Sequence, residues 1–296
     1  MHIIVTYFQF FCKIAKLPNL CYNNKKTRRI PMKRKHTFLS AIQEIRDTYR
    51  PNRYQLMPYL IRDGAYHPTA IICPGGGYRR VCSFVEGYPY AKKLNQLGYH
   101  AIVVYYRVKE AARFPAPQDD LARAVREIFE NADRWKLDTR CYSLWGSSAG
   151  GHLAASFGTD AVGYAKYSLP RPGAMILTYP VVTMGDLTHA GSRNFLLGPA
   201  PSPEQIRLTS VEHQITPNYP PTFLWWGDAD DTVDPANSRM MLAELEKNGI
   251  LCTHREYSGV GHGVGVGKGL ICEGWLEDAA AFWEEQRTDA AKKAAY

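Results

Sequence analysis

The chain has 296 residues, 36 of them Lys or Arg and 28 Asp or Glu, which gives a formal net charge of +8. Residues 1–35 contain nine of the basic residues and no acidic residue, so 27 basic (36 less nine) and 28 acidic residues remain from residue 36 onward. A nucleic-acid-binding domain carries its basic charge on the folded body, so this nearly neutral remainder does not indicate a nucleic-acid partner. The composition also excludes disordered, collagen-like and disulfide-rich classes.

Residues 1–35 are predicted to be a leader outside the functional domain, and residues 36–296 a single domain. The apolar run at residues 3–12 is shorter than the roughly 20 residues that a membrane-spanning helix needs. It also lacks the basic start and the small-residue cleavage site of a signal peptide. Three interpretations remain open: a native translation start at Met32, an atypical export or membrane-surface segment, or an extra element packed on the domain. We expect a cytoplasmic protein without stable membrane insertion, although export stays open.

The cysteines and glycine motifs predict neither a metal site nor a cofactor site. The seven cysteines are odd in number and include no C-x-x-C pair, which argues against a disulfide framework and against zinc. No phosphate-binding fingerprint of the G-x-G-x-x-G or G-K-[ST] type occurs in a suitable context.

Between residues 52 and 285 apolar strand-like runs alternate with periodic helix-like segments. This alternation predicts an α/β fold with a mostly parallel sheet covered by helices on both faces. Strands are expected at residues 54–61, 69–73, 100–106, 141–145, 174–180, 222–226 and 251–257. Helices are expected at residues 88–97, 117–135, 149–157, 235–248 and 271–286. Residues 181–220 contain five prolines and are expected to form a small insertion near a site.

The run Gly146-Ser147-Ser148-Ala149-Gly150 lies between a predicted strand and an alanine-rich predicted helix. A G-x-S-x-G motif in this context is typical of a nucleophile elbow, a sharp strained turn that presents the serine hydroxyl at a helix N-terminus. The spacing selects Ser148 as the nucleophile and not Ser147.

Three consecutive glycines, Gly75, Gly76 and Gly77, directly follow the second predicted strand. Backbone without side chains can turn its N–H groups toward a negative charge that develops during a reaction. On its own such a run is more often a turn, but its place two strands before the elbow is where an oxyanion loop is expected.

A catalytic histidine needs a carboxylate that fixes its tautomer, and the loop after the sixth strand supplies four aspartates. Asp230 is favoured because three residues beyond Gly227 is far enough into the loop to turn inward, and Asp231 remains the alternative. Asp228 and Asp234 are expected to be solvated, or in the case of Asp234 to cap a helix.

His262 follows the last predicted strand, which gives the order Ser, Asp, His that is expected of an α/β-hydrolase. The other histidines fail this test, and we expect them to be structural. His152 falls inside the elbow helix and His254 in the middle of a strand, while the predicted loops contain His67, His189 and His213.

With these four elements in order, the sequence resembles the α/β-hydrolase superfamily over about residues 50–287, and within it the bacterial acetyl-esterase and acetylxylan-esterase-like proteins. The matching motifs are residues 74–78, 86–87, 105–107, 146–152, 192–198, 220–224 and 237–238.

This resemblance implies an α/β-hydrolase fold without a large cap domain, and it implies roles for six residues. Ser148 is the implied nucleophile, Asp230 the acid and His262 the base. The implied oxyanion donors are the N–H groups of Gly76 or Gly77 together with that of Ala149. Two departures stand out: Pro74 replaces the usual histidine before the glycines, and Asp234 replaces the usual proline of Val-Pro after the acid.

The sequence therefore predicts a serine carboxylesterase that removes short acyl groups, acetyl above all, from an alcohol such as a sugar or oligosaccharide. Two alternatives are a peptidase or amidase like the catalytic domains of prolyl oligopeptidases, and a non-catalytic binding protein on the same scaffold. Candidate pocket residues are Tyr78, Tyr179, Trp225, Trp226 and Val264, with a place in the core as the commoner alternative for each aromatic residue. The sequence is silent on the natural ester and on the oligomeric state.

Overall fold

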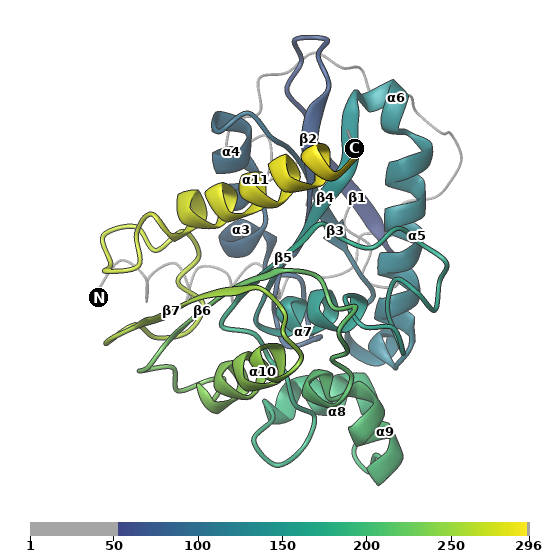
Figure 1. The fold of residues 1–296 in the computed structure, drawn as a ribbon. Helices are drawn as coiled ribbons and strands as arrows, with labels where there is room; N and C mark the ends of the chain where they lie inside the picture. The colour runs from purple at the N-terminus through teal and green to yellow at the C-terminus, as the bar shows by residue number, and fades with distance from the viewer. Residues whose placement is uncertain (1–52, 295–296) are drawn as a thin grey trace, which may run out of the picture. The chain divides into compact units, whose positions relative to one another are not determined.

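The computed structural model describes residues 53–294, whose centre is a seven-stranded sheet (Figure 1). The strand order is β1-β3-β2-β4-β5-β6-β7; β1 runs antiparallel to β3, and all other neighbours are parallel. The strands are β1 (Gln55–Tyr59), β2 (His67–Cys73), β3 (His100–Tyr105), β4 (Leu137–Ser147), β5 (Ala174–Thr178), β6 (Thr222–Gly227) and β7 (Cys252–Tyr257). All seven predicted strands are confirmed, with their ends moved by a few residues.

The burial of the strands explains why continuous apolar runs in the sequence predict them. Every residue of β3, β5 and β6 is buried, because helices cover both faces of the sheet and leave no solvated side. At the sheet edge, β7 has its three middle residues exposed and no fully buried residue.

The helices divide between the two faces of the sheet. They are α3 (Ser83–Glu86), α4 (Tyr88–Gln96), α5 (Ala116–Glu130), α6 (Ala132–Trp135), α7 (Ser148–Phe157), α8 (Ala190–Leu197), α9 (Pro203–Thr209), α10 (Ala236–Lys247) and α11 (Trp275–Ala294), with short 3₁₀ turns η1 (Lys109–Ala112) and η2 (Val211–His213). The chain moves outward from β2 to β3 and then back across to β4, so right-handed connections place α4 on one face and α5, α7 and α10 on the other. Helix α11 packs beside α4 and crosses the sheet in front of β4 in Figure 1.

The predicted helices differ from the observed ones in two places. The segment predicted as one helix at residues 117–135 is two, α5 and α6, which are separated at Asn131. The last helix begins at Trp275 and not at residue 271, because Gly274 has a φ of +98° and Ile271 is 71% exposed. The irregular region at residues 181–220 contains α8, α9 and η2, which form a small helical insertion between β5 and β6.

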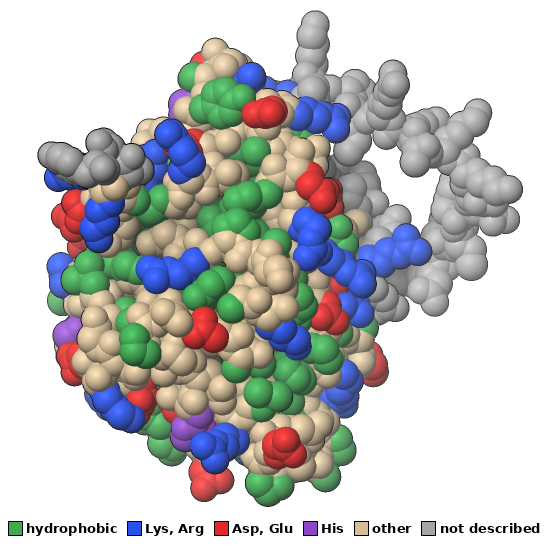
Figure 2. Space-filling view, turned by 45° about the vertical axis from the view of Figure 1, so that its right-hand side comes forward, with side chains coloured by type: hydrophobic (Ala, Val, Ile, Leu, Met, Phe, Trp, Pro, Cys, Tyr) green, Lys and Arg blue, Asp and Glu red, His purple; other side chains and the backbone are tan. Residues whose placement is uncertain are grey.

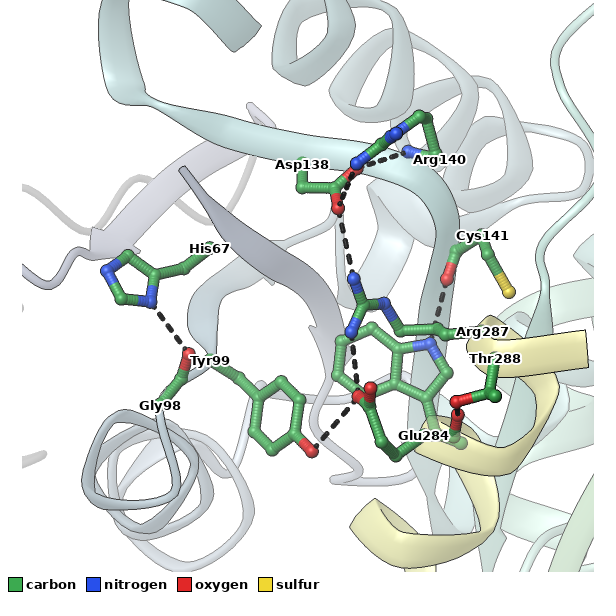
Figure 3. Close-up of polar contacts among 10 residues, drawn as sticks. His67, Gly98, Tyr99, Asp138, Arg140, Cys141, Glu284, Arg287 and Thr288 are labelled. Atoms are coloured by element: carbon green, nitrogen blue, oxygen red, sulfur yellow. Dashed lines mark hydrogen bonds and ion pairs between the residues drawn. The ribbon is translucent and has the colours of Figure 1, made fainter. Parts of the chain in front are cut away.

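Polar contacts hold α11 against the amino-terminal half of β4 (Figure 3). Arg287 forms an ion pair with Asp138 at 3.0 Å, and Asp138 also binds the guanidinium of Arg140. The indole N–H of Trp283 donates to the backbone carbonyl of Cys141 over 2.8 Å. The C-terminal helix is therefore attached at the end of β4 that lies away from the predicted elbow.

His67 is the first residue of β2, so its predicted place in a loop is wrong. Its Nδ1 lies 2.9 Å from the carbonyl oxygen of Gly98. The predicted leader at residues 1–35, Met32 included, lies outside the described residues.

The described part of the chain carries mixed surface charge. On the face drawn in Figure 2, Lys and Arg side chains are interspersed with Asp and Glu side chains, without a single basic patch. Across residues 53–294 no helix is long and apolar enough to cross a membrane. Within the same residues, no cluster of three or more His, Cys, Asp or Glu side chains could hold a metal ion.

Candidate active site

The order of the strands brings two loops together. The connections from β2 and from β4 leave in opposite directions, and a switch of this kind opens a crevice at the carboxyl ends of the two strands. Cys73 is paired with Gly146 at these ends, so the glycine loop and the predicted elbow are neighbours.

Ser148 is the first residue of α7 and has a φ of +54°, a strained value for a residue with a side chain. The turn is tight on both sides: a Cβ at Gly146 would overlap the carbonyl oxygen of Gly150, and a Cβ at Gly150 would overlap that of Cys73. The G-x-S-x-G pattern is thus explained by backbone clearance at both glycines.

Ser148, His262 and Asp230 form a continuous hydrogen-bonded chain. The Ser148 Oγ lies 2.8 Å from His262 Nε2, and His262 Nδ1 lies 2.6 Å from Asp230 Oδ2. Asp230 is held in turn by the backbone N–H groups of Thr232 and Val233, each 2.9 Å from its Oδ1. A carboxylate on Nδ1 keeps the proton there, so Nε2 is free to accept the serine proton.

The alternative acid, Asp231, lies elsewhere. Its side chain is exposed and receives a hydrogen bond from the hydroxyl of the adjacent Thr232, whereas the side chain of Asp230 is 2% exposed. The geometry therefore favours Asp230 as the acid.

The backbone N–H groups of the glycine loop differ in their hydrogen bonding. Gly75 donates its N–H to the carboxylate of Glu86 over 2.7 Å. The N–H groups of Gly76, Gly77 and Ala149, by contrast, have no hydrogen-bond acceptor within the described part of the chain. A Cβ at Gly75 would lie 2.7 Å from the Cβ of Ser148, so this loop touches the elbow. These three groups remain the predicted oxyanion donors.

Four of the five candidate pocket residues are buried. Tyr78 and Trp225 are 0% exposed, Tyr179 is 1% and Trp226 is 2%, so these side chains belong to the core. Large aromatic residues fill the space beneath the loops because their apolar area is best used in the interior. Val264 is partly exposed on the histidine loop and stays a predicted pocket residue.

The core position of Tyr179 supports the histidine directly. Its ring lies edge-on to the imidazole of His262, with 4.8 Å between the ring centroids, and its hydroxyl donates to Glu86 Oε1 over 2.9 Å.

Glu86 is a buried carboxyl group at the site that the sequence reasoning assigned no role. It is 3% exposed and lies at the end of α3. Burial raises the pKa of its carboxyl, and the pKa stays raised although the hydrogen bonds from Gly75 and Tyr179 act in the opposite direction. The sequence offers one indication, because residues 86–87 belong to the motifs shared with esterases. The pattern of apolar and polar residues around Glu86 does not show whether its side chain is buried or solvated.

His189, predicted to be structural, lies next to the glycine loop. Its Nδ1 accepts the backbone N–H of Ser192 at 3.2 Å, which caps α8 and leaves the proton on Nε2. Its Cε1 lies 3.3 Å from the position that a Cβ on Gly77 would take. Burial lowers the pKa of His189, and the nearby His262 lowers it further. The insertion after β5 therefore contributes a neutral imidazole beside the predicted oxyanion donors.

Comparison with known proteins gives relatives that are named as a xylanase and as esterases. The chain is 34% identical over 230 residues to endo-1,4-beta-xylanase B of Butyrivibrio fibrisolvens, which covers 74% of the chain and 36% of that protein. It is 29% identical over 199 residues to an acetylxylan esterase of Xylanibacter ruminicola, covering 66% of the chain and 40% of the relative. The chain thus spans less than half the length of these two curated relatives.

A solved structure agrees in fold. The acetyl ester-xyloside bifunctional hydrolase of Caldicellulosiruptor lactoaceticus superposes with a TM-score of 0.72 at 30% identity, covering 80% of this chain and 91% of that one. This similarity and the sheet topology confirm the α/β-hydrolase fold. The BD-FAE family model matches residues 62–245, more than half of the chain, and the chain therefore belongs to the BD-FAE family of α/β-hydrolases.

Proposed function

We propose that this protein is a serine carboxylesterase that hydrolyses short acyl esters, acetyl esters first, of sugar or oligosaccharide alcohols. The observation that carries the proposal is the hydrogen-bonded chain from Asp230 through His262 to Ser148, placed beside N–H groups without acceptors in the described chain. The names of the relatives, an acetylxylan esterase and an acetyl ester-xyloside hydrolase, support an ester of a xylose-containing saccharide as the substrate class.

In the first half of the reaction, His262 Nε2 takes the proton of Ser148 as its Oγ attacks the ester carbonyl. Asp230 holds the resulting imidazolium in place and stabilises its charge. The carbonyl oxygen becomes an oxyanion, which the N–H groups of Gly76 or Gly77 and of Ala149 stabilise. The tetrahedral intermediate then collapses, the alcohol leaves with the proton from His262, and Ser148 keeps the acyl group.

In the second half, water takes the place of the alcohol. His262 removes a proton from the water as it attacks the acyl-enzyme, the same donors hold the second oxyanion, and the carboxylic acid leaves as Ser148 regains its proton. Every step uses side chains and backbone groups of this chain.

The close packing around the serine supports a short acyl group. Ser148 is 6% exposed, and the glycine loop and His262 both lie in contact with it. A small acyl group such as acetyl fits this space better than a long chain, which needs an extended apolar channel.

A substrate panel tests the proposal. We expect hydrolysis of 4-nitrophenyl acetate and of acetylated xylo-oligosaccharides, with kcat/KM falling as the acyl chain lengthens from acetyl to octanoyl. A peptidyl 4-nitroanilide should be a poor substrate. Labelling by a fluorophosphonate probe should occur on Ser148 and be absent in Ser148→Ala. Efficient cleavage of the anilide without cleavage of the acetyl esters would contradict the proposal, and so would labelling of the Ser148→Ala variant.

A further inference from the structure

Glu86 connects the two halves of the candidate site through its two carboxylate oxygens. Oε2 accepts the N–H of Gly75, the first glycine of the oxyanion loop, at 2.7 Å. Oε1 accepts the hydroxyl proton of Tyr179 at 2.9 Å, and the Tyr179 ring packs edge-on against His262. One buried carboxylate therefore contacts both the loop that contains the predicted oxyanion donors and the tyrosine that packs on His262, the residue that becomes positively charged in the proposed reaction.

We propose that Glu86 is a positioning residue for the proposed esterase reaction: it fixes the glycine loop and Tyr179, and its negative charge stabilises the protonated form of His262. The proposal rests on the proposed function, because it assigns Glu86 a part in the same reaction. The Glu86 carboxylate accepts hydrogen bonds from Gly75 and Tyr179, and we propose that it acts through these two residues and its electric field.

The contacts around Glu86 form a buried network that leaves it in one orientation. The Tyr179 hydroxyl lies 3.4 Å from that of Tyr90, which receives a hydrogen bond from Ser147 Oγ at 3.2 Å. Thr178 in turn donates to Ser147 Oγ over 2.7 Å. Such a network is rigid when its members are satisfied, because each alternative orientation leaves a buried polar atom without a partner. The network thus extends from the oxyanion loop to the residue just before the nucleophile.

The charge of Glu86 is expected to matter because, among residues 53–294, few other charged groups interact with His262. Asp230 binds Nδ1, and His189 from the insertion interacts electrostatically with His262 and is a neutral imidazole, because burial and the nearby His262 lower its pKa. Arg80 is the cation that interacts with Glu86 at longer range. In a buried site a charge several ångströms away still acts strongly, because little water screens it. Removing the charge of Glu86 should therefore make the imidazolium less stable.

Glu86→Gln separates charge from shape. The glutamine carbonyl oxygen can still accept the N–H of Gly75, and its amide can donate to the Tyr179 oxygen, so both contacts survive without the charge. We expect the acid limb of the kcat/KM profile with 4-nitrophenyl acetate to move by about one pH unit to lower pH, and kcat to fall about tenfold with little change in KM. Glu86→Asp, which keeps the charge, should leave the limb within about 0.3 pH units of the wild type.

Tyr90→Phe is the matched control, since it removes a buried hydroxyl from the same network without altering any charge at neutral pH. It should not move the acid limb. If Glu86→Gln does not fold, Tyr179→Phe takes its place: this variant keeps the ring on His262 and removes a donor to Glu86. Glu86 then protonates more easily, and the limb should move in the same direction by a smaller amount.

The titration of the His262 imidazole, followed by NMR in protein with isotopically labelled histidine, gives a readout without ester turnover. We expect it to move to lower pH in Glu86→Gln, in step with the kinetic limb. A titration and a limb that stay at the wild-type pH in Glu86→Gln would overturn the proposal and leave Glu86 a structural residue. Failure of the wild-type protein to hydrolyse any ester would refute the proposed function, while the NMR titration would still decide the electrostatic part.

Discussion

The two ends of strand β4 differ in the way they hold their polar groups. At the carboxyl end Ser147 and Ser148 are buried, the backbone of Ser148 is strained at a φ of +54°, and the contacts lead inward to Glu86 and Tyr90. At the amino end Asp138 binds Arg287 and Arg140, and the Arg140 side chain is 90% exposed. One strand thus carries a strained, buried region at its carboxyl end and ion pairs at its amino end, where Asp138 and Arg287 are 10% and 19% exposed and Arg140 is hydrated.

This difference indicates that the contacts at the carboxyl end of β4 serve the proposed reaction, whereas those at the amino end attach α11 to the sheet. Strain at a position such as Ser148 costs roughly 1–3 kcal/mol and persists because the surrounding packing enforces it. Exposed ion pairs contribute about 0–1 kcal/mol each, since water competes with them. Substitutions at the carboxyl end should therefore change activity by large factors, whereas those at the amino end should change stability slightly and activity not at all.

Ser148→Ala should give the largest effect. Without its Oγ no acyl-enzyme can form, and we expect kcat/KM on an acetyl ester to fall by at least about 10⁴-fold. The unfolding temperature should stay within about 3 °C of the wild type, because Ala fits the same space. The neighbouring Ser147→Ala is the control, and it should keep both fluorophosphonate labelling and most of the activity. Comparable losses in the two variants would refute the assignment of Ser148.

The pair Asp230→Asn and Asp231→Asn tests the choice of the acid. Asn at residue 230 cannot stabilise the His262 imidazolium and favours the wrong tautomer, so kcat should fall by about 10⁴-fold. Asp231 is exposed and lies away from His262, so Asp231→Asn should stay within about twofold of the wild type. Steady-state kinetics of both variants decide the matter, and a larger loss at residue 231 would reverse the assignment.

The sequence predicted the fold and the three residues of the hydrogen-bonded chain because each leaves a local mark. Strands buried on both faces appear as continuous apolar runs, and the tight elbow demands glycine at residues 146 and 150. Ser148, Asp230 and His262 each follow a strand in the sequence. Because the carboxyl ends of parallel strands lie at one edge of the sheet, the order of the strands already predicts that the three residues lie together.

The remaining features depend on tertiary packing and left no such mark. Glu86 and His189 look like surface residues in sequence, and only the folded chain brings them to Gly75 and Gly77. The aromatic residues near the motifs are buried, and the residue type alone does not distinguish a core position from a pocket position. The start of α11 was misplaced because an exposed Ile271 has the same character in sequence as a buried one.

The substitution Gly76→Ala tests a crowded glycine in the loop after β2, and Gly98→Ala tests a glycine with open space around it. Gly76 has a φ of +123°, and a Cβ there would overlap the carbonyl oxygen of Arg80. We expect a loss of about 2–4 kcal/mol in the free energy of unfolding from strain and overlap. Displacement of a predicted oxyanion donor should lower kcat by about 10²-fold or more.

Gly98→Ala is the matched control for Gly76→Ala. Gly98 has a φ of +93°, but nothing lies within 4 Å of the position of a Cβ there. The backbone strain should cost about 1 kcal/mol and leave kcat unchanged. Urea denaturation and steady-state kinetics measure both quantities. Equal effects of the two substitutions on kcat would contradict a role for the glycine loop in the reaction.

Asp138→Asn, at the amino end of β4, should have the smallest effect. Burial by itself raises the pKa of Asp138, but the hydrogen bonds from Arg140 and the charges of Arg140 and Arg287 outweigh it and leave the pKa lowered. A lowered carboxyl pKa stabilises the fold above the unfolded value, near 4, and this contribution is lost as the pH falls through the lower folded value.

The wild type should therefore exceed Asp138→Asn in unfolding free energy by about 1 kcal/mol at pH 7, with the gap closing toward pH 3. Arg140→Ala should lower the stability at pH 7 by less than Asp138→Asn, because it removes one hydrogen bond and one charge that lower the pKa of Asp138 while Arg287 still binds the carboxylate. Neither variant should alter kcat. Urea denaturation at the two pH values measures the gap, and a gap that grows toward acid pH would show that α11 is attached to β4 by something other than the Asp138 carboxylate.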